Sequence, residues 1–149
     1  MKISTKGRYA LEAVVDLAYH SSNELESLKN IADRLDKSKN YLEQLFVILR
    51  QNGIVESIRG AQGGYKLAKP SKEITAGEVI RAVEGELVPV ACLVSSNDAI
   101  ACSRYKSCVS RLLWKGMSDE IDKVVDSITI EDLVLKYRDM NKETIEYFI

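Results

Sequence analysis

The segment from Leu28 to Leu67 is the feature that most constrains the fold of this chain. Its apolar residues follow helical spacing up to an interruption at Asp36, resume after Ser38, which can cap a second helix, and stop at Gly53. Two runs of alternating residues then flank a bend with three glycines, Gly60, Gly63 and Gly64. Two short helices, a tight turn and a hairpin make a winged helix. We therefore predict a mainly α fold with a small β wing, a winged helix-turn-helix.

The second helix of this pattern carries polar residues opposite its apolar stripe: Ser38, Lys39, Asn40, Glu43 and Gln44. In a helix-turn-helix, the N-terminal residues of this helix reach base edges in the major groove. Amide side chains can read adenine, a carboxylate can accept from the cytosine amino group, and Lys or Ser can hold phosphate. By itself such a face is more often simply solvated. Arg59, a cation on a glycine-rich tip that can approach a minor groove, favours binding to double-stranded DNA.

Charge and composition agree with this interpretation. Residues 1–70 hold 11 Lys and Arg against 8 Asp and Glu, whereas residues 71–149 hold 10 against 14. A basic front half and an acidic rear suit a site-specific DNA binder. The chain has no run of 18 apolar residues and no signal-peptide core, so we expect a soluble, cytoplasmic protein without a membrane partner.

No combination of residues in the chain suggests catalysis. The only histidine, His20, lies at the expected end of the first helix and is interpreted as a solvated surface group. Paired acids and phosphate-binding loops are not recognisable in the sequence, and a cysteine nucleophile would need a nearby base. We expect no catalytic residues and no enzyme activity.

Three parts follow from the spacing of the remaining elements. Residues 1–85 hold a first helix capped by Ser4 or Thr5, the winged helix, and a helix capped by Thr75, and form the DNA-binding domain. Residues 86–108 lack a sustained period and form a cysteine-containing sensor loop. Residues 109–149 hold a long dimerisation helix, then a last helix that Thr129 caps and that ends near Met140, then a tail.

The long helix carries apolar residues at steps of three and four, which is a heptad seam: Trp114, Met117, Ile121, Val124 and Ile128. A seam of this kind predicts packing against a second copy of the same helix. The chain should therefore form a two-fold homodimer that reads a palindromic operator.

All three cysteines of the chain, Cys92, Cys102 and Cys108, lie in the loop before this helix. Three thiolates form a soft ligand set suited to an iron–sulfur cluster or zinc. The alternatives are three free cysteines that pack as small hydrophobes, or a direct thiol redox switch at Cys102, whose thiolate Arg104 and Lys106 would favour.

Several motifs in order resemble the family of the IscR, NsrR and CymR repressors. They are the segments 3–10, 41–46, 58–65, 74–80 and 128–133, which together extend over most of the chain. The resemblance implies a dimeric winged-helix repressor. It also implies DNA contacts on the reading helix and the wing, at Ser38, Asn40, Tyr41, Glu43 and Arg59.

The resemblance further implies that the three cysteines hold a 2Fe-2S cluster that gates DNA affinity and so controls iron–sulfur or cysteine metabolism genes. This chain departs from the IscR type in a longer first cysteine spacing and in Arg111, which replaces a ligating histidine and cannot bind metal. Other members take a fourth ligand from the first helix of the partner subunit. The matching position is Arg8, and Glu12, one turn later, is the candidate here.

The last three residues, Tyr147, Phe148 and Ile149, resemble the ends of CymR-type repressors, which enter the active site of cysteine synthase. An apolar end with a free carboxylate suits capture in a partner's pocket. The alternative function is therefore a cluster-free repressor of cysteine metabolism that cysteine synthase regulates. Of the two we favour the cluster sensor.

Overall fold

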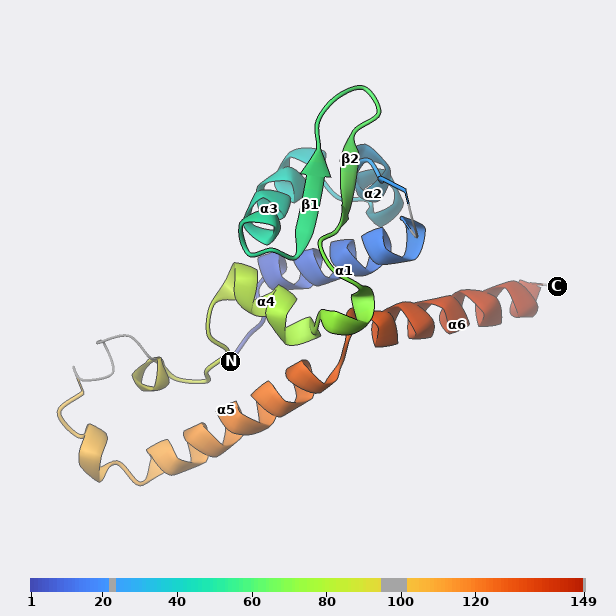
Figure 1. Ribbon diagram of the computed structural model, residues 1–149. Helices are drawn as coiled ribbons and strands as arrows, with labels where there is room; N and C mark the ends of the chain where they lie inside the picture. The colour runs from blue at the N-terminus through green and yellow to red at the C-terminus, as the bar shows by residue number, and fades with distance from the viewer. Residues whose placement is uncertain (22–23, 95–101, 149) are drawn as a thin grey trace.

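A computed structural model describes residues 1–21, 24–94 and 102–148 of the chain. Its upper body in Figure 1 consists of three helices and a hairpin: α1 (Thr5–His20), α2 (Leu28–Leu35), α3 (Lys39–Gln51), β1 (Val55–Ile58) and β2 (Gly64–Leu67). Beneath α1 lie three further helices: α4 (Ala76–Glu84), α5 (Ser110–Ser127) and α6 (Ile130–Phe148). Helices α5 and α6 extend in opposite directions from their junction (Figure 1). The predicted mainly α winged helix is confirmed.

Hydroxyl side chains cap the starts of α2, α4 and α6, as the sequence predicts for the last two. Ser27 Oγ accepts from Asn30 N at the start of α2, and Thr75 Oγ1 accepts from Glu78 N at the start of α4. At the start of α6, Thr129 Oγ1 accepts from Asp132 N, and the Asp132 carboxylate accepts from Thr129 N. This reciprocal pair is a capping box, which satisfies two backbone donors that a helix terminus otherwise leaves free.

Helix α1 is capped differently from the prediction. Ser4 occupies the N-cap position, but its side chain caps no backbone amide. Instead, Glu84 at the end of α4 accepts from Ser4 N at 3.1 Å and from Gly7 N at 2.9 Å. A carboxylate here complements the positive end of the helix dipole. The end of α4 therefore holds the start of α1.

The core lies among α1, α2, α3, β1 and α4. Its largest fully buried side chains come from these elements, from the segments beside them and from the start of α6: Phe46, Leu17, Ile31, Leu42, Leu45, Leu49, Ile54, Ile74 and Ile130. Because Ile130 belongs to this core, α6 is anchored to the winged helix. Backbone hydrogen bonds from Ala76 N to Ile128 O and from Ile130 N to Ile74 O, both 2.8 Å, join the starts of α4 and α6.

The hairpin is held to the rest of the fold through β2. Tyr65 N donates to Glu26 O at 2.8 Å and Glu26 N donates to Tyr65 O at 2.9 Å, so the segment before α2 pairs with β2. At the tip, Gly63 N donates to Gly60 O, and a Cβ on Gly63 would overlap the carbonyl of Ile58. The wing therefore projects from the helix-turn-helix at a set angle (Figure 1).

Two expectations about the second half of the chain need correction. The last helix does not end near Met140 but continues to Phe148, so that most of the predicted tail is helical backbone. The predicted loop contains short 3-10 turns at Ala91–Leu93 and Tyr105–Ser107. Within the described ranges, none of the helices is long and apolar enough to cross a membrane.

Candidate nucleic-acid interface and cysteine loop

Helix α3 has one polar face and one buried face. It begins at Ser38, whose Oγ accepts from Tyr41 N at 3.3 Å. The polar side chains predicted to face DNA are exposed: Lys39, Asn40, Glu43 and Gln44. The apolar stripe on the other side is buried in the core: Leu42, Leu45, Phe46 and Leu49. This arrangement leaves the N-terminal half of the helix free to enter a major groove.

Tyr41 is half-buried and joins a cluster that the sequence analysis missed. Its ring meets Tyr9 of α1 edge-on, with centroids 5.8 Å apart. Lys37, in the turn before α3, lies with its Nζ 3.8 Å from the centre of the Tyr9 ring and 3.7 Å from the carboxylate of Glu12. The turn and the start of α3 are therefore both packed on α1.

A cluster of ion pairs around Arg34, here called the Arg34 brace, joins α2 to α1. Arg34 of α2 donates from Nη2 to Asp16 Oδ2 at 2.6 Å and pairs with Glu26 at 3.2 Å. Asp16 is only 3% exposed. Burial alone would raise the pKa of Glu26, but hydrogen bonds from Asn30 and Ser27 N and the charge of Arg34 hold it below its ordinary value. The hydrogen bond to Asp16 raises the pKa of Arg34. This brace fixes α2 on α1.

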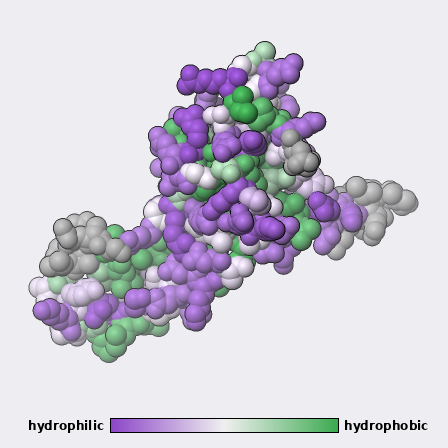
Figure 2. Space-filling model, viewed as in Figure 1, coloured by the Kyte–Doolittle hydropathy of each residue, from purple (hydrophilic) through white to green (hydrophobic). Residues whose placement is uncertain are grey.

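Arg59 lies at the start of the wing loop and is exposed. Gly60, which follows it, has a φ of 116°, a backbone conformation that favours glycine. The loop extends beyond α2 and α3 (Figure 1), and Figure 2 shows hydrophilic and hydrophobic residues together at this part of the molecule. The structure therefore presents this cation at the outermost part of the winged helix.

The three cysteines lie on separate parts of the loop between α4 and α5. Cys92 is half-buried in a 3-10 turn, Cys102 is exposed, and Cys108 is half-buried two residues before α5. Residues 95–101, between the first two cysteines, lie outside the described ranges. Among the described residues, no three His, Cys, Asp or Glu side chains lie close enough to hold a metal ion.

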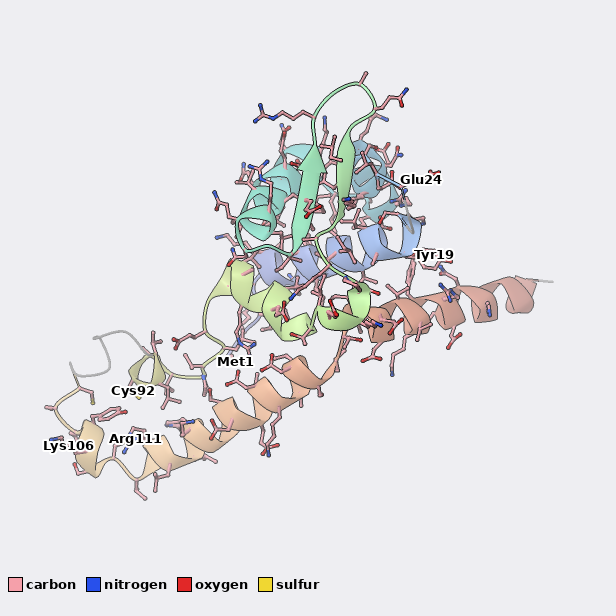
Figure 3. The ribbon with its side chains drawn as sticks, viewed as in Figure 1. Met1, Tyr19, Glu24, Cys92, Lys106 and Arg111 are labelled. Atoms are coloured by element: carbon pink, nitrogen blue, oxygen red, sulfur yellow. The ribbon has the colours of Figure 1, made fainter. Side chains whose placement is uncertain are left out.

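The surroundings of Cys108 favour a thiolate. Its Sγ lies 3.1 Å from Ser110 Oγ, and that hydrogen bond, the backbone N–H groups of Arg111 and Ser110 and the charge of Arg104 lower its pKa. The Arg111 guanidinium faces elsewhere: Nε donates to Tyr105 O at 3.0 Å, and the group stacks 4.3 Å from the centre of the Tyr105 ring. Three thiolates suit an iron–sulfur cluster, but Arg111 cannot be its fourth ligand. Figure 3 shows Cys92 and Arg111 at the end of the molecule far from the wing.

Helix α5, which follows this loop, is fastened to α4 by Arg81. Its Nη1 donates to Asp126 Oδ1 at 2.6 Å and its Nη2 to Asp122 Oδ1 at 2.7 Å. These carboxylates raise the pKa of Arg81 further above its ordinary value. Ser118, buried in the same contact, donates to Leu87 O at 3.3 Å. The helix that follows the cysteine loop is therefore joined to the winged helix through α4.

The predicted seam is partly exposed, and its last residue, Ile128, lies directly after the end of α5 in an extended conformation. Met117 and Val124 are 42% and 56% exposed, whereas the other three seam residues are half-buried: Trp114, Ile121 and Ile128. The most exposed apolar side chains at the start of α5 lie outside the heptad spacing and were missed: Val109, Leu112 and Leu113. Figure 2 shows hydrophobic surface at this end of the molecule.

The predicted C-terminal handle is only partly described. The backbone of Tyr147 and Phe148 forms the last turn of α6, but their side chains lie outside the described part of the chain. Ile149 lies wholly outside it.

Together, a polar helix in a helix-turn-helix, an exposed wing cation and a cysteine loop joined to the winged helix define a DNA-binding transcriptional regulator. The chain matches the family model "Rrf2: Iron-dependent Transcriptional regulator" over residues 3–136 and belongs to the Rrf2 family. The predicted resemblance to IscR and CymR repressors and the expected absence of enzyme activity are confirmed, because the relatives are transcriptional regulators.

Two relatives represent the two branches that the sequence resembles. The chain is 42% identical to the HTH-type transcriptional regulator CymR of Bacillus subtilis over 149 residues, 100% of both chains. It is 43% identical to IscR of Cereibacter sphaeroides over 136 residues, 90% of this chain and 87% of the relative. The solved structure of CymR (YrzC), the global cysteine regulator of B. subtilis, aligns with a TM-score of 0.75, covering 91% of this chain and 98% of that one.

Proposed function

We propose that this chain is a repressor that binds a palindromic operator as a homodimer and whose DNA affinity depends on a 2Fe-2S cluster held by its cysteine loop. In this proposal α3 reads the major groove with Ser38, Lys39, Asn40, Tyr41, Glu43 and Gln44. Arg59 inserts into the flanking minor groove. The support is the exposure of these polar side chains on an element whose other face is buried.

Homodimerisation is assigned to the seam of Trp114, Met117, Ile121 and Val124 on α5 and Ile128 directly after it. Its support is the heptad spacing and the exposure of Met117 and Val124 on a helix that extends away from the winged helix. Two copies related by a two-fold axis present two copies of α3, and so they match two half-sites of a palindrome.

One observation carries the cluster proposal: every cysteine of the chain lies in the loop that leads into α5, and none lies in the core. Cys92, Cys102 and Cys108 supply three thiolates, and the surroundings of Cys108 already favour its charged form. When bound, the cluster supplies an oxidation-sensitive group that ties these parts of the loop together. The iron dependence of the Rrf2 regulators and the likeness to IscR support the same choice.

The fourth ligand in this proposal is Glu12 of a partner subunit. Glu12 lies on α1 and is half-exposed, and its present neighbour is Lys37 at 3.7 Å. A carboxylate is a weaker partner for iron than a thiolate or an imidazole, so we expect a labile cluster. Loss of the cluster changes DNA affinity only if the loop with the cluster and the loop without it favour different positions of the two α3 helices.

The test compares wild-type protein with a Cys92→Ala, Cys102→Ala, Cys108→Ala variant, both purified without oxygen. We expect iron, sulfide and visible circular dichroism in the wild type alone, and a change in operator affinity of about 5–150-fold between its holo and apo forms. The variant should bind the operator like apo wild type, which checks its folding. Equal spectra, or equal operator affinity of holo and apo forms, would contradict the proposal.

The second candidate is a cluster-free regulator of cysteine metabolism that binds cysteine synthase through Tyr147, Phe148 and Ile149. One observation favours it: the alignment with CymR, the global cysteine regulator of B. subtilis, extends over the full length of both chains. Calorimetric titration with cysteine synthase separates the candidates. Binding by colourless wild-type protein that is lost when Ile149 is deleted would favour this function.

A further inference from the structure

The turn at the tip of the wing carries two side chains besides that of Arg59. Gly63 N donates to Gly60 O at 3.0 Å, which closes a β-turn with Ala61 and Gln62 at its two corners. Both corner residues are exposed. Neither has a positive φ, so the turn holds both side chains without backbone strain. The turn therefore presents a methyl group and a primary amide at the outermost part of the winged helix (Figure 1).

The sequence of the tip leaves the amide as its only polar side chain. In the segment 60–64, glycine occupies three of the five positions and alanine a fourth. At Gly63 a Cβ would overlap the carbonyl oxygen of Ile58, so the turn can close against β1 only with glycine there. The two corners have no such restriction. Gln62 is therefore the one residue of this segment that can form side-chain hydrogen bonds.

The Gln62 amide is not used within the protein, in contrast to polar groups lower on the hairpin. Ser57 Oγ accepts from Arg50 Nη1 at 3.2 Å, and Lys66 lies 3.7 Å from Glu56. The Gln62 side chain forms no hydrogen bond with any residue in the part of the chain that the structure describes. Its two N–H donors and its carbonyl oxygen are therefore available to a partner outside the chain.

The chemistry of a minor groove matches these donors. A·T pairs expose only acceptors there, adenine N3 and thymine O2, whereas a G·C pair adds the guanine amino donor. A narrow, A·T-rich minor groove also has the negative potential that attracts arginine. In the proposed function, Arg59 enters such a groove directly before the turn. The amide of Gln62 then lies beside a row of acceptors, and Ala61 adds only a methyl group to a tip that faces a groove about 6 Å wide.

We infer that Gln62 is a specificity-determining residue, which donates from its amide to adenine N3 or thymine O2. This contact makes the regulator prefer an A·T pair beside the one that Arg59 contacts. The inference rests on the proposed DNA binding and adds a second base-reading element, on the wing, to the reading helix α3. Because the amide carries no charge, its contribution changes base preference without changing the salt dependence of binding.

The test uses an operator selected from random DNA with the wild-type protein. In a second copy of this operator, 2,6-diaminopurine replaces the adenines that flank each half-site. This base adds the minor-groove amino group of guanine and keeps the major-groove edge of adenine, so the contacts of α3 are preserved. The wild type should bind the second operator about three- to tenfold more weakly, because a donor then faces the amide donors. Gln62→Ala should bind both operators equally.

Two further variants separate this role from a general loss of binding. Gln51→Ala removes an exposed glutamine at the end of α3 and should keep the affinity and the base preference of the wild type. Arg59→Ala should reduce the slope of affinity against salt, whereas Gln62→Ala should leave that slope unchanged. Gel shifts at several salt concentrations measure affinity, preference and slope together.

The outcomes distinguish this inference from the proposed function. If Arg59→Ala weakens binding but Gln62→Ala keeps the wild-type preference for adenine over diaminopurine, the role of Gln62 is wrong and the proposed DNA reading stands. A selected operator without A·T pairs at the flanks has the same meaning. A wild type that selects no operator at all overturns the proposed function as well.

Discussion

At the scale of single residues, the proposed contact of Arg59 with DNA can be tested separately from the contribution of other cations on the wing. Arg59→Ala should weaken operator binding by about 1–3 kcal/mol and reduce the slope of affinity against salt by about 1, because one phosphate-region contact is lost. Lys66→Ala is the control. It removes the same charge from β2, where the ammonium lies 3.7 Å from Glu56, and should change both quantities little. Gel shifts at several salt concentrations measure the two effects, and equal losses would contradict the assignment.

Glu43 should determine sequence preference more than affinity. A carboxylate accepts from the cytosine amino group and repels most other groove edges, so Glu43→Gln should widen the bases tolerated at one position. Selection from a randomised operator, followed by sequencing, compares the wild type with this variant. An unchanged preference with uniformly weaker binding would show that Glu43 does not read a base.

Cys108 should react as a thiolate at lower pH than an ordinary cysteine. Because the pKa of Cys108 is lowered in the folded chain, chiefly by the Ser110 hydrogen bond, a larger fraction of this thiol is charged at a given pH than in an ordinary cysteine. Iodoacetamide labelling of metal-free protein across pH, followed by mass spectrometry of the Cys108 peptide, should give a lower midpoint in the folded protein than in the unfolded protein. Ser110→Ala should move the midpoint upward. A midpoint that this variant leaves unchanged would rule out the hydrogen bond as the cause.

The residues that could be predicted are those whose partners are near in sequence. Ser38, Thr75 and Thr129 cap helices by bonding to backbone groups three residues away, so a short pattern reveals them. The Glu84 cap on α1 joins residues that are 77 and 80 positions apart in the sequence. The brace between Arg34 and Asp16 joins residues that are 18 positions apart. A local pattern cannot reveal such contacts, because they exist only after the helices pack.

At the scale of secondary-structure elements, α4 connects α5 to the winged helix. Arg81→Ala should lower the free energy of unfolding by about 1–2 kcal/mol, since it leaves two carboxylates of α5 without their guanidinium. The control is Lys115→Ala on α5, which removes an exposed local pair with Asp119 and should cost less than about 0.5 kcal/mol. Urea denaturation at one fixed protein concentration measures both. Equal losses would mean that Arg81 does not fasten α5.

The bounds of the helices show where periodicity stops being informative. The cap at Thr129 predicts the start of α6, but the end predicted near Met140 falls short of Phe148, where the helix ends. No Gly or Pro occurs between Ile130 and the last residue, and the intervening residues tolerate helix well. On α5, the heptad rule selected Trp114 and its repeats. It missed Leu112, which is exposed but lies outside the heptad spacing.

At the scale of the whole molecule, α5 and α6 extend in opposite directions beneath the winged helix (Figure 1). In the proposed homodimer each winged helix is one of two reading heads, and the packing of α5 on its partner sets the distance between them. The sequence of one copy therefore predicts the fold of that copy but not the spacing between two copies.

A fixed spacing makes a definite prediction for the operator. Inserting five base pairs between the half-sites of an operator selected from random DNA turns one half-site by about half a helical turn. Affinity should then fall toward that of a single half-site, because two heads joined through α5 cannot both face the groove. Inserting ten base pairs restores the rotational orientation of the two half-sites but leaves them farther apart. Affinity should then recover only in part. Gel shifts with the three operators measure this series, and equal affinity for all three would mean that the two reading heads move independently.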